Sequence, residues 1–486
     1  MTIRDIFPQI GISGDSGQIP INGISRDTRL LSKGDLFFII EGINFDIFSC
    51  LNGIQGKAAA FVADKKHKSM VNSIIKATPV IFVNDVKAEL KRCTDIFYPL
   101  DMNRFRIIGV TGTNGKTTVA YLIRHLLNKF GIKNAMTGTI KYFIADEDME
   151  AYHTTPDYLS LRKFLFEVQR KNIEYVIMEV SSHSIEQKRI EGLRFMQCIF
   201  TNLSRDHLDY HLDMDKYFSA KKKLFLDNPD TISIINTDDK YGKLLFSSVK
   251  GVKYSYGFGE NAYYKAFGYE PEKRGLRFVL DIQGRCSLNI RSSLIGRHNV
   301  LNILSALASL DKIGFSLKEA ASFVYSFGGV DGRIDEAAED VFIDYAHTPD
   351  ALYNALYALR DSGYNNIILV FGCGGNRDRG KRKEMGKIAS EEATFSLITS
   401  DNPRNENAED ICRDIESGFG KNNYRIVVNR KEAIAEAIKL RNNYNNCAVL
   451  IAGKGHEEYQ IIGNKKIPFK DKKVVKEIIK KGINSK

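Results

Sequence analysis

The pattern of apolar and polar positions near residue 110 predicts a strand, a turn and a helix in that order. Residues 107–110 form a short apolar run that suits a buried strand. After a glycine-rich turn, apolar side chains recur at helical spacing from Val119 to Leu127, and Gly131 is placed to end the helix. This unit is the clearest element of the sequence, and the other predicted elements are arranged around it.

The turn inside this unit has the composition of a phosphate cradle. It contains Gly112 and Gly115, and Lys116 and Thr117 follow directly. In such a turn, backbone N–H groups and the helix N-terminus face an anion, the lysine reaches the terminal phosphates, and the threonine can hold Mg²⁺. An ordinary strand-to-helix turn would gain nothing from the Lys-Thr pair. Because Val110 stands where the general pattern has its first glycine, the motif here is the Thr-Gly-Thr-x-Gly-Lys-Thr-Thr version.

Further apolar runs alternate with helical stretches along the chain, which predicts an α/β fold with mostly parallel sheets. In the first part, Lys33 and Gly34 predict a turn before a strand at residues 35–39. The other predicted strands are 175–180, 198–201 and 232–235 in the middle of the chain, and 341–343, 367–371, 395–398 and 448–451 in its last third.

The length of 486 residues is too great for one hydrophobic core, so several domains are expected. We expect boundaries that divide the chain into residues 1–100, 101–328 and 329–486. Tyr98 and Pro99 lie in a plausible linker at the first boundary.

Composition narrows the class of protein. The hydrophobic fraction of 43% and charged fraction of 27% are typical of a soluble globular protein, and no apolar run approaches a membrane span. The N-terminus lacks a signal-peptide core, and the seven cysteines are scattered without metal spacing, so we expect reduced thiols in a cytoplasm. The net charge of +11 could indicate nucleic acid. We expect none, because residues 465–486 look like a solvated basic tail and no aromatic–basic motif could read bases.

Polar side chains follow the predicted strands of the central sheet. Glu179 closes one strand, where a carboxylate could bind a metal ion. His207 lies in the loop after the next strand, although a single histidine is often structural. Lys221 lies in a run of three lysines, which by itself is typical of a solvated helix face.

The last third has polar loops after each of its predicted strands. These loops begin at Asp344, Gly372, Asp401 and Gly453. Any one of them alone could be an ordinary turn. Because the carboxyl ends of parallel strands meet at one edge of a sheet, the four loops together favour a site.

These motifs taken together resemble the Mur ligases, the ATP-dependent amino-acid-adding enzymes of peptidoglycan precursor synthesis. The likeness covers nearly the whole chain and is strongest to the members that add diaminopimelate as the third residue. The motifs that carry it are residues 111–118, 153–156, 179–183 with Gln187 and Arg189, 206–210, 296–299, 344–349, 401–404 and 453–457. The resemblance implies an N-terminal α/β UDP-binding domain, a central ATPase domain with a mostly parallel sheet, and a C-terminal Rossmann-like domain for the incoming amino acid.

The resemblance also implies a mechanism. ATP phosphorylates the D-glutamyl carboxylate of UDP-N-acetylmuramoyl-L-Ala-D-Glu to an acyl phosphate, which the amine of meso-diaminopimelate then attacks. Two anions must approach each other, so Lys116 and two Mg²⁺ ions would supply positive charge. Thr117 would hold one Mg²⁺, while Glu179 and His207 would hold the other. Lys221 matches a lysine that CO₂ converts to a carbamate, an anionic oxygen ligand where a free ammonium would repel Mg²⁺.

Two further sets of residues follow from the resemblance. The expected ATP-binding residues are Gly112, Thr113, Asn114, Gly115, Lys116, Thr117, Thr118, Asn299, Arg333 and Asp344. The expected residues for the UDP-sugar dipeptide are Arg26, Thr28, Thr154, Thr155, Ser181, Gln187 and Arg189, with the loop at Gly42.

The choice of amino acid is expected to depend on Arg404. Diaminopimelate carries a distal carboxylate that lysine lacks, and a guanidinium can bind it with two parallel hydrogen bonds. The expected diaminopimelate-binding residues are Arg377, Asp401, Asn402, Pro403, Arg404, Gly453 and Glu457, with Glu457 as acceptor for the distal ammonium.

Three alternatives compete with this interpretation. A lysine-adding ligase would need a neutral or small residue at Arg404. A folylpolyglutamate synthase would share the ATPase core but act on a pterin. A non-catalytic binding protein would be expected to lack catalytic side chains such as Lys116 and Lys221, which are present. We expect a monomer.

Overall fold

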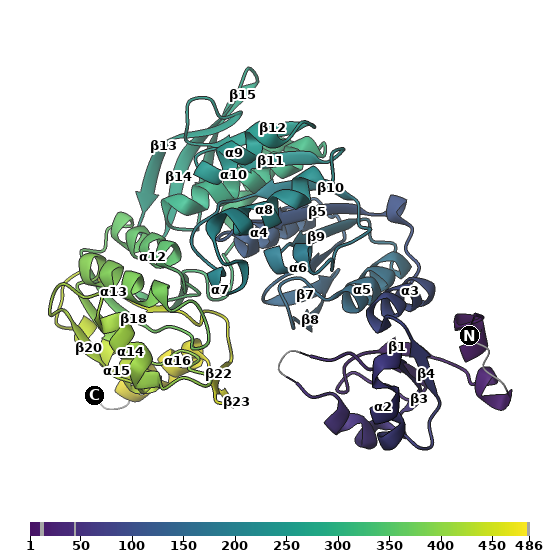
Figure 1. Cartoon of the computed structure of the whole chain (residues 1–486). Helices are drawn as coiled ribbons and strands as arrows, with labels where there is room; N and C mark the ends of the chain where they lie inside the picture. Colours follow the sequence, from purple (N-terminus) through teal and green to yellow (C-terminus); the bar gives the residue numbers. More distant parts are fainter. Residues whose placement is uncertain (10–13, 43–44, 484–486) are drawn as a thin grey trace. The chain divides into compact units, whose positions relative to one another are not determined.

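The computed structural model describes residues 1–9, 14–42 and 45–483 (Figure 1). The chain folds into two compact units, and each is described by itself. The first unit comprises Met1–Phe105, Pro156–Ile173 and Lys188–Glu191, and the second comprises Arg106–Thr155, Glu174–Gln187 and Gly192–Lys486. The expected domain boundaries near residues 100 and 328 stay predictions.

The first unit is built on a parallel sheet in the order β1-β2-β3-β4. Alternate residues of its central strands face opposite sides, so Leu36 and Phe38 join one core while Phe37 joins another. The strands are β1 (Gly23–Ser25), β2 (Asp35–Phe38), β3 (Ala58–Asp64) and β4 (Val80–Val83), and the helices are α1 (Ile3–Ile6), α2 (Lys68–Ile74), α3 (Val86–Phe97) and α5 (Tyr158–Arg170). α5 lies far along the sequence but packs against α3 in this unit.

The second unit begins with a large sheet in the order β15-β14-β13-β12-β11-β10-β5-β9-β6-β7-β8. In this spatial order, the seven consecutive strands from β13 to β6 run parallel to one another. Antiparallel strands extend the sheet at both edges. The parallel strands are β5 (Arg106–Thr111), β6 (Asn134–Thr137), β9 (Tyr175–Glu179), β10 (Phe195–Phe200), β11 (Ile232–Asn236), β12 (Lys253–Gly257) and β13 (Tyr264–Glu272). The edge strands are β7 (Lys141–Ile144), β8 (Glu147–Glu150), β14 (Gly275–Ile282) and β15 (Cys286–Ser292).

Two helices cover the part of this sheet that carries the glycine-rich loop. α4 (Lys116–Lys129) begins directly after the loop, and α10 (Arg297–Lys312) packs against it and against β11–β13. α10 is buried on nearly all sides, as expected for a helix rich in Leu, Ile and Ala. The other helices of this part are α6 (Ser182–Glu186), α7 (Leu208–His211), α8 (Met214–Leu226), α9 (Lys240–Ser248) and α11 (Leu317–Phe323).

The last third forms a sheet in the order β16-β17-β21-β18-β19-β20, drawn in green to yellow in Figure 1. Ile367, Leu369 and Phe371 face α12–α14, while Ile368 and Val370 face α15 and α16. This burial on both faces explains the continuous apolar run of the strand. The elements are β16 (Asp335–Ala338), β17 (Val341–Asp344), β18 (Asn366–Phe371), β19 (Phe395–Ile398), β20 (Tyr424–Ile426), β21 (Cys447–Ala452), α12 (Pro349–Asp361), α13 (Gly380–Glu392), α14 (Ala408–Glu416), α15 (Arg430–Arg441) and α16 (Asp471–Ile483), with a hairpin of β22 (Tyr459–Ile462) and β23 (Lys465–Pro468).

The predicted α/β class with mostly parallel sheets is confirmed, but the predicted solvated tail is wrong. Residues 465–483 form β23 and α16, and residues 484–486 lie outside the described part. Val474 and Val475 are buried in the core of the last sheet because the lysines of α16 alternate with apolar residues at helical spacing. Within the described ranges, no helix is long and apolar enough to cross a membrane.

Candidate active site

The glycine-rich loop between β5 and α4 has a backbone that only glycine fits at two positions. Gly112 has φ +149°, and a Cβ there would lie 1.9 Å from Thr201 Oγ1. Gly115 has φ +88° and precedes the first residue of α4, and its Cβ would lie 2.5 Å from Asn302 Oδ1. The loop therefore packs closely on the neighbouring strand end and on α10, with the N-terminus of α4 beside it.

Lys116 is held over this loop. Its Nζ donates hydrogen bonds to the carbonyl oxygens of Gly112, at 3.0 Å, and Thr113, at 2.8 Å. Desolvation lowers the pKa of Lys116, and the negative charges of Glu179 and Asp206 oppose that shift. The ammonium thus lies where an anion bound to the loop would meet it.

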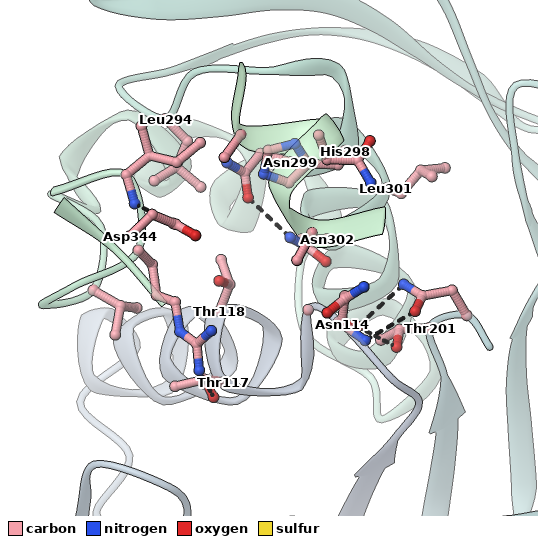
Figure 2. Close-up of a pocket in the computed structure, with 18 of the residues that line it drawn as sticks. Asn114, Thr117, Thr118, Thr201, Leu294, His298, Asn299, Leu301, Asn302 and Asp344 are labelled. Carbon is pink, nitrogen blue, oxygen red and sulfur yellow. Dashed lines mark hydrogen bonds between the residues drawn. The ribbon is translucent and has the colours of Figure 1, made fainter. Parts of the chain in front are cut away.

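A cleft of about 870 Å³, open solvent included, lies beside the loop (Figure 2). Seven of the expected ATP-binding residues line it, namely Asn114, Gly115, Thr117, Thr118, Asn299, Arg333 and Asp344. Gly112, Thr113 and Lys116 belong to the adjoining loop and are not part of the lining. A cleft lined by several polar side chains next to a glycine-rich loop is a candidate site for a small molecule that carries phosphate groups.

The last third of the chain supplies one wall of this cleft. Arg333 Nη2 donates to Thr117 Oγ1 at 3.3 Å. Asp344 accepts hydrogen bonds from the backbone N–H groups of Ile334 and Ala346, each at 2.7 Å. Burial raises the pKa of Asp344, and the positive charge of Arg333 opposes that effect. The carboxylate therefore fixes the turn that presents the arginine to the glycine-rich loop.

Amide side chains form the rest of the polar lining. Asn302 Nδ2 donates to Asn299 Oδ1 at 2.8 Å on α10, a bond visible in Figure 2. Asn114 Nδ2 donates to Asp350 Oδ2 at 2.7 Å, and its backbone N–H donates to Asn202 Oδ1 at 2.9 Å. Asp350, Asn202 and Asn302 were not among the predicted site residues, because single polar residues in a turn or helix carry no distinctive spacing.

Glu179 at the end of β9 is fully buried. It accepts hydrogen bonds from Thr117 Oγ1 at 2.9 Å, from Thr139 N at 2.9 Å and from Thr139 Oγ1 at 3.0 Å. The carboxylate and the Thr117 hydroxyl are thus in contact, which is the arrangement that oxygen-liganded cations use. Within residues 1–9, 14–42 and 45–483, no cluster of three His, Cys, Asp or Glu side chains could hold a metal ion alone.

Lys221 on α8 is not the solvated lysine that its surroundings in the sequence suggest. Its side chain is only 2% exposed, and Nζ donates to Gly112 O at 2.8 Å and to Thr111 Oγ1 at 3.5 Å. Burial and the positive charge of Lys116 lower its pKa well below the ordinary value. Its nitrogen therefore lies at the glycine-rich loop with its pKa shifted in the direction that favours the neutral amine, the form that reacts with CO₂.

His207 lies in the left-handed region with φ +55°, which is uncommon outside glycine. Its ring nitrogen Nε2 lies 3.4 Å from Asp206 Oδ2, and its backbone N–H donates to Asp206 Oδ1 at 2.8 Å. Burial lowers the pKa of His207 to about 3, the negative charge of Asp206 opposes this shift, and the positive charge of Lys116 adds to it. The imidazole is therefore neutral, as a metal ligand must be.

The residues expected to bind the UDP-sugar dipeptide are divided between the two units. Arg26, Thr28 and Arg189 belong to the first unit, where Arg26 Nε lies 4.0 Å from Asp157 Oδ1. Residues 43–44 of the loop at Gly42 lie outside the described residues. The other four belong to the second unit and are Thr154, Thr155, Ser181 and Gln187.

In the second unit, Thr154, Thr155 and Ser181 lie near the end of β9. Thr155 Oγ1 donates to Glu179 O at 2.8 Å and accepts from Ser181 N at 3.0 Å. Thr154 Oγ1 lies 3.1 Å from Thr139 Oγ1, which itself donates to Glu179. Thr155 thus contacts the backbone of Glu179, and Thr154 is linked to the buried carboxylate through Thr139.

The residues expected to bind diaminopimelate gather at the carboxyl ends of β18, β19 and β21. Arg404 Nη1 donates to the carbonyl oxygens of Gly375, at 2.9 Å, and Asn402, at 3.4 Å. Arg404 also has φ +53°, a strained conformation that its backbone bonds to Ile461 and Gly463 maintain. Burial and the charge of Arg377 lower the pKa of the Arg404 guanidinium. A bound carboxylate would compensate for both effects.

The remaining members of this group lie around a loop with a tight glycine. Gly453 has φ +111°, and a Cβ there would lie 2.5 Å from Asp401 Oδ2. Asn402 Nδ2 donates to Glu457 Oε2 at 2.8 Å, so two expected contacts are joined to each other. Pro403 is buried beside them, whereas Arg377 is exposed and its Nη1 donates to Asn376 O.

Comparisons with known proteins identify the family of the chain. Residues 110–310 match the Mur ligase middle domain, and residues 332–455 match the Mur ligase glutamate ligase domain. The chain is 38% identical, over 96% of its own length and 96% of the relative, to a UDP-N-acetylmuramoyl-L-alanyl-D-glutamate–2,6-diaminopimelate ligase of Clostridium acetobutylicum. A solved structure of a ligase with that name is 30% identical over 99% of both chains, with a TM-score of 0.61.

A folylpolyglutamate synthase of Mycobacterium tuberculosis shares the fold at 16% identity, over 75% of this chain and 91% of that one, with a TM-score of 0.64. That likeness concerns the fold alone. The two family models together match most of the second unit. The ligase of Clostridium acetobutylicum matches 96% of the chain. The protein belongs to the Mur ligase family.

Proposed function

We propose that the protein is an ATP-dependent amide ligase that adds meso-diaminopimelate to UDP-N-acetylmuramoyl-L-Ala-D-Glu, with release of ADP and phosphate. The reaction would serve peptidoglycan precursor synthesis in the cytoplasm. The observation that supports it most is the position of Arg404 among the side chains that match the family's diaminopimelate contacts, in a chain related end to end to ligases with that name.

In this proposal ATP occupies the cleft beside the glycine-rich loop. The loop N–H groups and Lys116 would hold the phosphates, while Asn299 and Asp344 would lie along the nucleotide. Arg333 contacts Thr117 and would add a second positive charge where the phosphoryl group is transferred. Both cations would offset the repulsion between the γ-phosphate and the substrate carboxylate.

The residues present fit Mg²⁺. Thr117 and Glu179 offer hard oxygen ligands in contact with each other, and His207 offers a neutral imidazole. Because Mg²⁺ uses few protein ligands and takes the rest from phosphates and water, a cluster of three acidic or histidine side chains is not needed. When bound, the ions would neutralise charge on the transferring phosphate.

A carbamate on Lys221 fits the same site. A buried ammonium beside Lys116 and Mg²⁺ would be unfavourable, whereas the neutral amine is a nucleophile for CO₂ and the resulting anion would offset the local positive charge. We therefore propose two Mg²⁺ sites, with Thr117 at one and Glu179, His207 and the Lys221 carbamate at the other.

The amino acid would lie against the loops of the last sheet. Among the residues that the structure describes, the side-chain hydrogen bonds of Arg404 come from Nη1, which leaves the edge formed by Nε and Nη2 for the distal carboxylate. Glu457 would accept from the distal ammonium. Leaving the half-buried guanidinium without an anion costs free energy, so lysine would be a poor substrate.

The remaining assignments are proposals of the same kind. The residues that would contact the UDP-sugar dipeptide are Arg26, Thr28, Thr154, Thr155, Ser181, Gln187 and Arg189. We propose domains at residues 1–100, 101–328 and 329–486, and a monomeric enzyme.

Phosphate release by the purified protein tests the proposal. ATP and UDP-N-acetylmuramoyl-L-Ala-D-Glu would be supplied with meso-diaminopimelate, with lysine or with no amino acid, and a folate acceptor with glutamate would be tested in parallel. We expect turnover with meso-diaminopimelate alone. Equal turnover with lysine, or turnover with folate only, would reverse the assignment, and no turnover with any acceptor would favour a binding protein.

A further inference from the structure

We propose that Lys454 is a positioning residue for the amino-acid substrate, which sets the orientation of Glu457 and Asn402 without touching the substrate. The proposal rests on the function proposed above. Lys454 lies in the loop after β21 and is fully buried, with 0% of its side chain exposed. A ligand that enters the site from solvent therefore meets Glu457, which is partly exposed, and not the lysine behind it.

The local sequence explains why a lysine is turned inward here. Lys454 stands between Gly453, with φ +111°, and Gly455, with φ +53°. A Cβ on Gly455 would lie 2.7 Å from the Cβ of Tyr345 and 2.8 Å from Gly332 O. The two glycines let the loop pass tightly over its neighbours, and the lysine side chain is directed underneath it.

The Lys454 ammonium binds two side chains of the proposed amino-acid site. Nζ donates to Glu457 Oε2 at 2.8 Å and to Asn402 Oδ1 at 3.3 Å. A buried ammonium needs an anion and further acceptors, and these two side chains supply them. The lysine is therefore bound to the expected acceptor of the distal ammonium and to the amide next to it.

These contacts determine how each group faces the substrate. Asn402 Oδ1 also accepts from Ile461 N at 2.9 Å, so its Nδ2 must face Glu457, where it donates to Oε2. Among the described residues, the hydrogen bonds that Glu457 accepts go to Oε2. Oε1 is thus left for a donor on the ligand. Without Lys454, both the carboxylate rotamer and the amide orientation lose a buried partner.

Two effects of removing the lysine oppose each other. The loss of a nearby positive charge would strengthen the attraction of Glu457 for an ammonium. The loss of geometry, together with a carboxylate left partly buried without its cation, would weaken it. We expect the second effect to dominate, because a charge-assisted hydrogen bond between buried groups contributes more than a screened attraction at the site mouth.

The test compares Lys454→Met with the wild-type enzyme, using two amino acids that differ in one group. meso-Diaminopimelate has the distal ammonium, whereas 2-aminopimelate keeps the reacting amine and the distal carboxylate but lacks that ammonium. We expect kcat/KM for diaminopimelate to fall by about tenfold or more, mainly through KM. The kcat/KM for 2-aminopimelate and the KM for ATP should change little. Lys454→Gln, which keeps a donor, should recover part of the loss, and it provides the same comparison if Lys454→Met does not fold.

A double variant separates positioning from a general structural role. If Lys454 acts through Glu457, then Lys454→Met with Glu457→Gln should lose little more activity on diaminopimelate than Glu457→Gln alone. Equal losses for both amino acids, additive losses in the double variant, or tighter binding of diaminopimelate to Lys454→Met would each overturn the proposal. A wild-type enzyme that turns over neither amino acid would instead refute the proposed function.

Discussion

Substitution of Arg404 by methionine tests the proposed choice of amino acid most directly. Methionine keeps much of the buried length of the side chain but removes the charge and the donors. In the structure Nη1 donates to Gly375 O and Asn402 O, so the edge formed by Nε and Nη2 could make two parallel hydrogen bonds to one carboxylate. Only diaminopimelate brings that carboxylate.

The size of the effect follows from this geometry. Removing one partner of a desolvated, hydrogen-bonded charge pair costs about 2–5 kcal/mol. At about 1.4 kcal/mol per tenfold, kcat/KM for diaminopimelate should fall by about 30-fold or more. Activity with lysine should stay low but should not fall in parallel, so the preference between the two amino acids should nearly disappear.

The assay is phosphate release at saturating ATP and UDP-sugar dipeptide, with either amino acid varied. Arg379→Met is the matched control, because Arg379 is also an arginine near this loop but is 72% exposed and paired with Glu406 on the surface. Arg379→Met should keep the wild-type kcat/KM for both amino acids. If Arg404→Met discriminates between diaminopimelate and lysine as well as the wild type does, the reasoning on the distal carboxylate is wrong.

Three further predictions concern the catalytic loop and the stability of the fold. Lys221→Ala should lose most of its ligase activity and regain part of it with added acetate. Wild-type protein in ¹³CO₂ should show a carbamate signal by NMR. Full activity in the variant, or no such signal in the wild type, would refute the carbamate. Gly115→Ala should weaken ATP binding by about tenfold, because a left-handed non-glycine residue costs about 1–2 kcal/mol and its Cβ would meet Asn302; an unchanged KM for ATP would contradict this. Asp471→Ala should destabilise the protein by about 3–5 kcal/mol in denaturant unfolding, because the carboxylate makes two 2.8 Å bonds to the buried Arg430, and a loss below about 1 kcal/mol would show that the pair is not needed.

The strands that carry the chemistry were predictable because each is buried on both faces. Residues 367–371 form a continuous apolar run in the sequence, and in the structure they belong to strand β18. β14 and β15 were not predicted, because polar residues such as Arg277 and Arg291 interrupt their apolar positions and their pairing depends on neighbouring strands. The basic C-terminal segment was misread because its lysines dominate the composition, whereas the few buried valines decide its structure.

For the site, the amino-acid sequence alone determined the chemistry of the individual groups. A glycine-rich turn followed by Lys116 and Thr117 needs no tertiary information to indicate a phosphate site, because all the groups lie within one turn of the chain. Only the tertiary structure decided the state of Lys221, since burial and the nearness of Lys116 are set by residues more than a hundred positions away. For Lys454 the two partners differ: Glu457 lies three residues further along the same loop, whereas Asn402 reaches the ammonium only because β19 and β21 end at the same edge of the sheet. Local spacing fixes which groups are available, whereas desolvation and long-range contacts set their charge and orientation.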